Sequence, residues 1–197
     1  MHELLILAIV VIATMAVTTV AARLIGPALR MVEYVLVCGS VLVILFVMAF
    51  VGIEVLMRYA FNSPIPGHLE GSELLMPIIV FLALGYTQAT NGHVGMDLVL
   101  DALKGNARLY ATAATLLASA FICAVLTYFA AKNAYQLYGY DDVTMTPPYF
   151  RTWPAAAAIP LGYAMAALRM YLQMLHLFSP ERFPAFGQAN HEMAAAD

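Results

Sequence analysis

The chain has 197 residues, of which 63% are apolar and 11% are charged, whereas soluble domains average about 45–50% apolar and about 25% charged residues. Nine Lys and Arg with twelve Asp and Glu cannot cover the polar surface of a soluble globule of this size, which argues against a soluble enzyme, a nucleic-acid-binding protein and a disordered chain. The mean hydropathy is +0.82, the net charge is only −3, and two cysteines are too few for a disulfide framework. The composition predicts an integral membrane protein.

Five apolar stretches are long enough for helices that cross the hydrocarbon core of a bilayer, which takes about 20 residues. They cover residues 4–22, 31–57, 74–89, 109–131 and 155–178, and the third can be extended through 92–100. Each is apolar on all sides, and no alternating strands of the kind that close a membrane barrel occur. We therefore expect an all-α integral membrane protein that ends in a polar tail, residues 179–197.

The first stretch, residues 4–22, has two interpretations. A cleaved secretory signal is supported by Val20-Ala21-Ala22, which would suit a signal peptidase. A retained membrane helix is favoured, because the chain starts with the acidic Met1-His2-Glu3 where a signal is basic, and because the apolar run is long for a signal core.

If all five stretches cross the membrane, the basic residues outside the stretches divide five to three between its sides, with Arg23, Arg30, Lys104, Arg108 and Arg182 on one side and Arg58, Lys132 and Arg151 on the other. Cytoplasmic loops carry an excess of basic residues. The first side is therefore predicted to be cytoplasmic, with the carboxyl terminus inside and the amino terminus outside. The aromatic-rich segment 135–153 fits an outer membrane interface.

Ionisable side chains beside membrane helices are functional candidates, and the first group lies around the second and third stretches. Glu54 and Arg58 are four residues apart and can neutralise each other on one helix face. Alternatively, Arg58 pairs with Glu70 or Glu73 at the start of the third helix, where carboxylates also suit the helix dipole without any further role.

A second group follows the third stretch in Asn91-Gly92-His93-Val94-Gly95-Met96-Asp97. His93 and Asp97 are four residues apart, a spacing that allows a hydrogen bond between them along one helix face. The alternatives are that the segment is a solvated helix end or that it contacts another subunit or lipid. His93 and His176 would both have to face the bundle interior to ligate a haem, and no Cys and His spacing suggests zinc. We expect no cofactor and no metal.

The fifth stretch carries small residues at intervals of four, Ala158, Gly162 and Ala166. Such a stripe permits close helix packing in a membrane, and Ala114 and Ala118 repeat the spacing in the fourth stretch. Cys38 and Cys123 are interpreted as buried apolar fillers. The sequence shows no broken helices at mid-membrane depth, which would indicate that this chain has its own ion site. These patterns favour a small structural subunit of a membrane complex.

The segment from Glu54 to Asp97 resembles the DctQ family, the small membrane subunit of tripartite ATP-independent periplasmic (TRAP) transporters. The resemblance rests on Arg58-Tyr59 at a helix end, the turn Pro64-Ile65-Pro66-Gly67, Glu73-Leu74, Gly85, and a closing element with His93-Val94 and Asp97. Thr146-Pro147-Pro148 and Ile159-Pro160 also match. The similarity extends from about Met31 to Leu177.

The resemblance implies a non-catalytic subunit of a secondary transporter in the bacterial inner membrane, importing organic acids with an ion gradient, usually of sodium. It implies two partners, a large permease subunit of the DctM type and a periplasmic substrate-binding protein, besides membrane lipids; no nucleic acid is expected. Arg58, Tyr59, Glu70, Glu73, His93 and Asp97 become structural or subunit-contact candidates. A haem- or quinone-binding anchor of a respiratory enzyme is the alternative function.

This sequence departs from the family pattern at two positions. Family members often have a tryptophan near the position of Glu70 and a basic residue shortly before the histidine, where this chain has Thr90-Asn91. The family core also has four helices. We therefore divide the chain into an extra hydrophobic helix with a short basic linker (residues 1–30), a four-helix membrane domain (31–178) and the tail (179–197).

Overall fold

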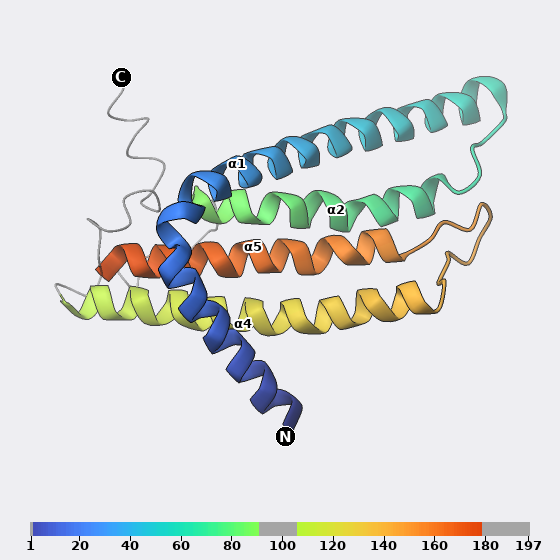
Figure 1. Cartoon of the computed structure of the whole chain (residues 1–197). Helices are drawn as coiled ribbons and strands as arrows, with labels where there is room; N and C mark the ends of the chain where they lie inside the picture. Colours follow the sequence, from blue (N-terminus) through green and yellow to red (C-terminus); the bar gives the residue numbers. More distant parts are fainter. Residues whose placement is uncertain (1, 91–105, 179–197) are drawn as a thin grey trace, which may run out of the picture.

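The computed structural model describes residues 2–90 and 106–178, with side chains from residue 28 onward. Within these residues the chain forms four long helices, α1 (His2–Phe61), α2 (His68–Ala89), α4 (Asn106–Gly139) and α5 (Trp153–Phe178). They lie lengthwise beside one another in the order α1, α2, α5 and α4 (Figure 1). The predicted all-α membrane bundle is thereby confirmed.

All four helices are long and apolar enough to cross a membrane, over Ala28–Phe61, His68–Ala89, Ala107–Gly139 and Trp153–Phe178 within the described residues. The predicted stretches 31–57, 74–89, 109–131 and 155–178 lie inside these spans. The helices extend beyond the stretches because the polar residues that flank each apolar run continue the helix. At the start of α2 these include Glu70 and Glu73, and carboxylates are favourable in a first turn.

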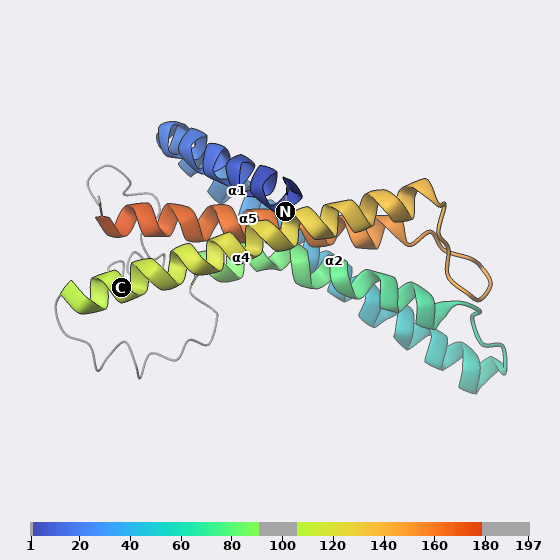
Figure 2. The same cartoon turned by 90° about the horizontal axis from the view of Figure 1, so that it is seen from below.

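The structure does not show the predicted extra amino-terminal helix and its linker as a separate element. Residues 2–61 form one uninterrupted helix, α1, whose first part leaves the direction of the bundle (dark blue in Figures 1 and 2). Gly26-Pro27 lie in this helix, and a proline inside a helix permits a bend without ending it. An uninterrupted helix cannot fold back on itself, so the five antiparallel crossings that placed the amino terminus outside lose their basis.

The two ends of the bundle differ in their connections. The turn 62–67 and the loop 140–152 both lie at one end, which we call the loop end (Figure 1). The end of α2, the start of α4 and the end of α5 lie at the opposite end. Figure 2 shows the pair α1 and α2 diverging from α4 and α5 toward the loop end, where loop 140–152 contacts α2.

The described part of α1 buries one narrow stripe. Glu33, Ser40 and Glu54 are at most 2% exposed, and positions 36, 43, 47, 50 and 57, which are among the partly buried ones, lie between and beside them. This alternation of three and four residues is the spacing of left-handed helix packing. Most other positions of α1 are exposed and apolar, which leaves a wide surface for lipid or for another membrane protein.

Helices α2 and α5 approach each other closely at Gly162. A Cβ atom added at Gly162 would overlap the carbonyl oxygen of Phe81 and lie 2.7 Å from its Cβ, so only glycine fits at this point. The ring of Phe81 also contacts Tyr163 edge to face, with 4.9 Å between centroids. Ala158 and Ala166 on the same stripe of α5 are buried. The smallest residues of α5 therefore lie where its neighbours come nearest.

Candidate functional site

A buried ion pair joins α1 to α5. Arg169 Nη1 lies 3.5 Å from Glu33 Oε2, and both side chains are 2% exposed. Gly85 of α2 faces the same region, because a Cβ added there would lie 3.7 Å from Glu33 Cγ and 3.2 Å from Met165 Cβ. Glu33 Oε1 is buried without a hydrogen-bond partner among the described residues. Three helices thus meet around one pair of opposite charges.

Two further polar contacts connect helices near this pair. The Gln88 side chain of α2 donates to Gln173 Oε1 of α5 at 2.8 Å, and Gln173 Nε2 donates back to the Gln88 carbonyl at 3.1 Å. The Ser40 hydroxyl of α1 donates to the Ile79 carbonyl of α2 at 2.8 Å. Since unpaired polar groups are costly in lipid, these bonds specify which helix faces contact each other.

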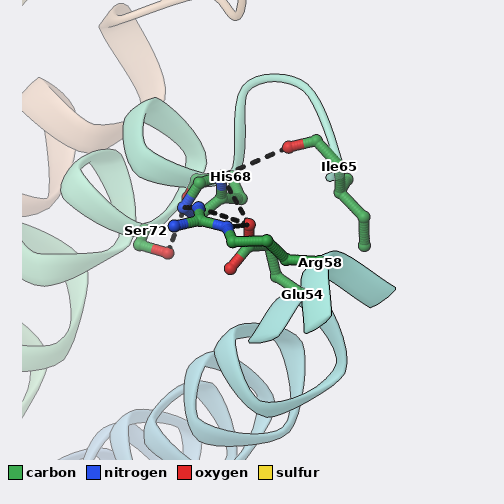
Figure 3. A network of polar contacts seen from close by, with 5 residues as sticks. All are labelled: Glu54, Arg58, Ile65, His68 and Ser72. Carbon is green, nitrogen blue, oxygen red and sulfur yellow. Dashed lines mark hydrogen bonds and ion pairs between the residues drawn. The ribbon is translucent and has the colours of Figure 1, made fainter. Parts of the chain in front are cut away.

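At the loop end, Glu54, Arg58 and His68 form a small network (Figure 3). Arg58 Nε and Nη2 donate to Glu54 Oε1 at 2.9 and 2.5 Å, and the same oxygen lies 3.7 Å from His68 Nδ1. Glu54 is buried, whereas the Arg58 side chain is 47% exposed. The Ser72 hydroxyl donates to the His68 carbonyl at 2.8 Å. The network therefore ties the end of α1 to the start of α2.

Loop 140–152 contacts the first turns of α2. The Thr146 hydroxyl donates to the Glu70 carboxylate, and Phe150 lies against Gly71, 3.7 Å from the position that a Cβ would take. Gly67 has φ +75, and an added Cβ would overlap Pro148, so both the backbone conformation and the space require glycine here. These contacts join the two diverging helix pairs at the loop end.

The structure places the predicted residues in different surroundings. Arg58 pairs with Glu54 and not with Glu70 or Glu73. Glu70 binds loop 140–152, and Glu73 is exposed with no polar contact to the described part of the chain. Tyr59 is 82% exposed. His93 and Asp97 lie outside the described residues.

Other predicted features are placed as follows. Cys38 is exposed and Cys123 partly buried, so the prediction of a buried apolar filler is wrong for Cys38. His176 lies in the last turn of α5, while its suggested haem partner His93 is outside the described residues. Among residues 28–90 and 106–178, no three His, Cys, Asp or Glu side chains gather to hold a metal ion.

Sequence reasoning missed the Arg169 contact and the role of Glu33. Arg169 lies nine residues before the end of α5, and a charge inside an apolar stretch demands a buried partner. Glu33, Ser40 and Glu54 are separated by seven and fourteen residues. This spacing was a second available signal, because positions that repeat every seven residues lie on one packing face of a helix. Their partners on distant helices could not be identified without the fold.

Comparison with known proteins identifies the family. The family model for tripartite ATP-independent periplasmic transporters, DctQ component, matches residues 47–179, about two thirds of the chain, from the second half of α1 to the end of α5. No curated protein matches the chain. The match lends no support to a haem- or quinone-binding anchor. The protein is a multi-pass membrane protein and a transporter component, not an enzyme, and it belongs to the DctQ family of TRAP transporter small permease subunits.

Proposed function

We propose that this chain is the scaffold for the large permease subunit, of the DctM type, of a TRAP secondary transporter in the bacterial inner membrane. The transporter imports organic acids that a periplasmic binding protein delivers, and a sodium gradient drives the uptake. The large subunit carries the substrate and ion sites, and the small subunit holds it in the membrane.

The burial pattern supports this division of labour. Each of the buried polar side chains in the described residues, Glu33, Ser40, Glu54, Gln88 and Arg169, contacts another residue of the same chain. These contacts within the chain support a structural role for the buried polar groups. Meanwhile α1 exposes large apolar side chains from Met31 to Phe61, a surface that a second membrane protein can cover in part.

We further propose that the loop end faces the periplasm and that the carboxyl terminus is cytoplasmic. With α1 as one crossing, Arg30 and Arg108 fall on the side opposite the loop end, against Arg58, Lys132 and Arg151. The order of the helices along the sequence assigns Lys104 and Arg182, outside the described residues, to the same side as Arg30. The basic excess on the first side favours the cytoplasm. Fusions after Asp197 test this: green fluorescent protein should fluoresce and alkaline phosphatase should be inactive, and the reverse result contradicts the orientation.

Reconstitution tests the scaffold role. The chain, a candidate large permease of the DctM type, and the pair are each incorporated into proteoliposomes with an inward sodium gradient, and uptake of labelled organic acids is measured with a candidate binding protein present. We expect uptake only with the pair. Uptake by this chain alone contradicts the proposal, as does full activity of the large permease without it.

A substitution on α1 locates the contact. Gly52 is exposed, and an added Cβ meets nothing within 4 Å, so Gly52→Leu leaves the bundle intact but projects into any partner packed there. We expect reduced co-purification of the large permease. Gly139→Leu at the end of α4, where there is also open space, is the matched control and should co-purify normally.

A further inference from the structure

The ring of His68 is held at both nitrogens (Figure 3). Nδ1 lies 3.2 Å from the Ile65 carbonyl oxygen, and Nε2 lies 3.4 Å from Arg58 Nη2. A guanidinium only donates hydrogen bonds and a carbonyl only accepts them. Nε2 must therefore accept from Arg58 while Nδ1 carries the proton and donates to Ile65. Both contacts are satisfied together only by the neutral ring.

The protonated ring does not fit the same arrangement. Its Nε2 becomes a donor and faces the Arg58 N–H donor, so the hydrogen bond is lost and two positive charges stand 3.4 Å apart. Its Nδ1 lies 3.7 Å from Glu54 Oε1, the oxygen that already accepts both Arg58 bonds. The proton on Nδ1 is present in both forms of the ring, so what protonation changes is the charge beside Glu54 and the Nε2 contact with Arg58.

The charged groups that face His68 come from α1 and α2. Glu54 and Arg58 face it from α1, and Glu70 lies on its own helix. Loop 140–152 brings the Thr146 hydroxyl to Glu70 and Pro148 to Gly67, and neither is ionisable.

We propose that His68 is a pH-sensitive latch between α1 and α2. The neutral ring holds Arg58 against the start of α2; the charged ring loses this hydrogen bond and repels the guanidinium from His68. Because Arg58 is already half exposed, its released charge moves to the surface of the loop end. A latch that changes with the charge of a histidine and faces the periplasm responds to external pH. That physiological use rests on the proposed orientation, but the latch itself does not.

Nuclear magnetic resonance of the full chain in lipid nanodiscs tests the latch without the permease. The ring nitrogens of His68 and the Nε–H of Arg58 are followed from pH 8 to pH 5, with Arg58→Lys to assign the arginine signal. We expect both sets of signals to shift along one titration curve. His68→Gln should abolish the Arg58 shift, whereas His176→Gln, at the opposite end of the bundle, should leave it unchanged.

Two results overturn the latch: His68 titrates while the Arg58 signal stays fixed, or the His68 ring does not change its protonation over this range. The wild-type titration decides between these outcomes even where a variant does not fold. Because the measurement needs no transport, its failure is distinct from a failure of the scaffold role in reconstituted uptake.

Discussion

Glu33 of α1 and Arg169 of α5 stand 3.5 Å apart inside the bundle, both almost completely shielded from the surroundings. Removing one member of a buried pair leaves an uncompensated charge, which costs about 3–5 kcal/mol, whereas replacing both by apolar residues is often neutral. The pair therefore dictates which helices assemble more than it adds to their stability.

Glu33→Leu is expected to destabilise the protein strongly because it leaves the Arg169 charge buried. The double variant Glu33→Leu with Arg169→Leu should recover most of the lost stability, since neither charge then remains. Thermal unfolding of the purified protein in detergent measures both. A double variant as unstable as the single one would contradict a dominant role for the stranded charge.

Gly162→Ala should separate α2 from α5, because the new methyl group collides with the Phe81 backbone and overpacking costs about 1–3 kcal/mol. Gly52→Ala is the matched control in the same kind of helix: it meets nothing within 4 Å and gains up to about 1 kcal/mol in helix propensity. The two midpoints of thermal unfolding should move in opposite directions. Equal shifts would argue against a close contact at Gly162.

The reciprocal bonds between Gln88 and Gln173 should show measurable coupling. Hydrogen bonds between membrane helices are worth about 0.6 kcal/mol on average and up to about 1.7. Gln88→Leu, Gln173→Leu and the double variant form the cycle, read from unfolding free energies. Because two bonds are lost together, we expect a value in the upper part of this range; strictly additive effects would show that the contact contributes nothing.

Thr146→Val should loosen loop 140–152 from α2, because the hydroxyl that binds Glu70 is removed at nearly constant volume. Hydrogen–deuterium exchange of the loop amides is expected to rise several-fold while the helices are unaffected. Thr127→Val, whose hydroxyl binds a carbonyl of its own helix, is the control. A loop that exchanges at the wild-type rate would indicate that its other contacts suffice.

Helix number and position within the family core followed from apolar length alone, because lipid leaves a spanning chain few alternatives to a helix. The continuity of α1 was missed because Arg23, Gly26-Pro27 and Arg30 were taken as a linker, although neither charges nor one proline must end a helix. Local pairs such as Glu54 with Arg58 were within reach, since four-residue spacing brings them together.

Contacts between distant segments could not be obtained in this way. That Thr146 and not Arg58 binds Glu70 depends on how loop 140–152 returns over α2. Likewise, Gly67 was read as part of a turn, but its need to be glycine comes from Pro148, far along the chain. Such pairings are set by the packing of whole helices, which cannot be predicted from the spacing of residues within one segment.

The partners Glu33 and Arg169 are 136 residues apart in the chain, and this interval constrains how the protein is made. Synthesis proceeds from the amino terminus, so α1 reaches the bilayer before the last helix exists. A lone carboxylate is costly in hydrocarbon, so this part of α1 must stay near water or headgroups until its counter-ion emerges from the ribosome. Insertion of α5 thus also allows α1 to take its final position in the membrane. A chain truncated before α5 is therefore expected to be defective in the placement of α1.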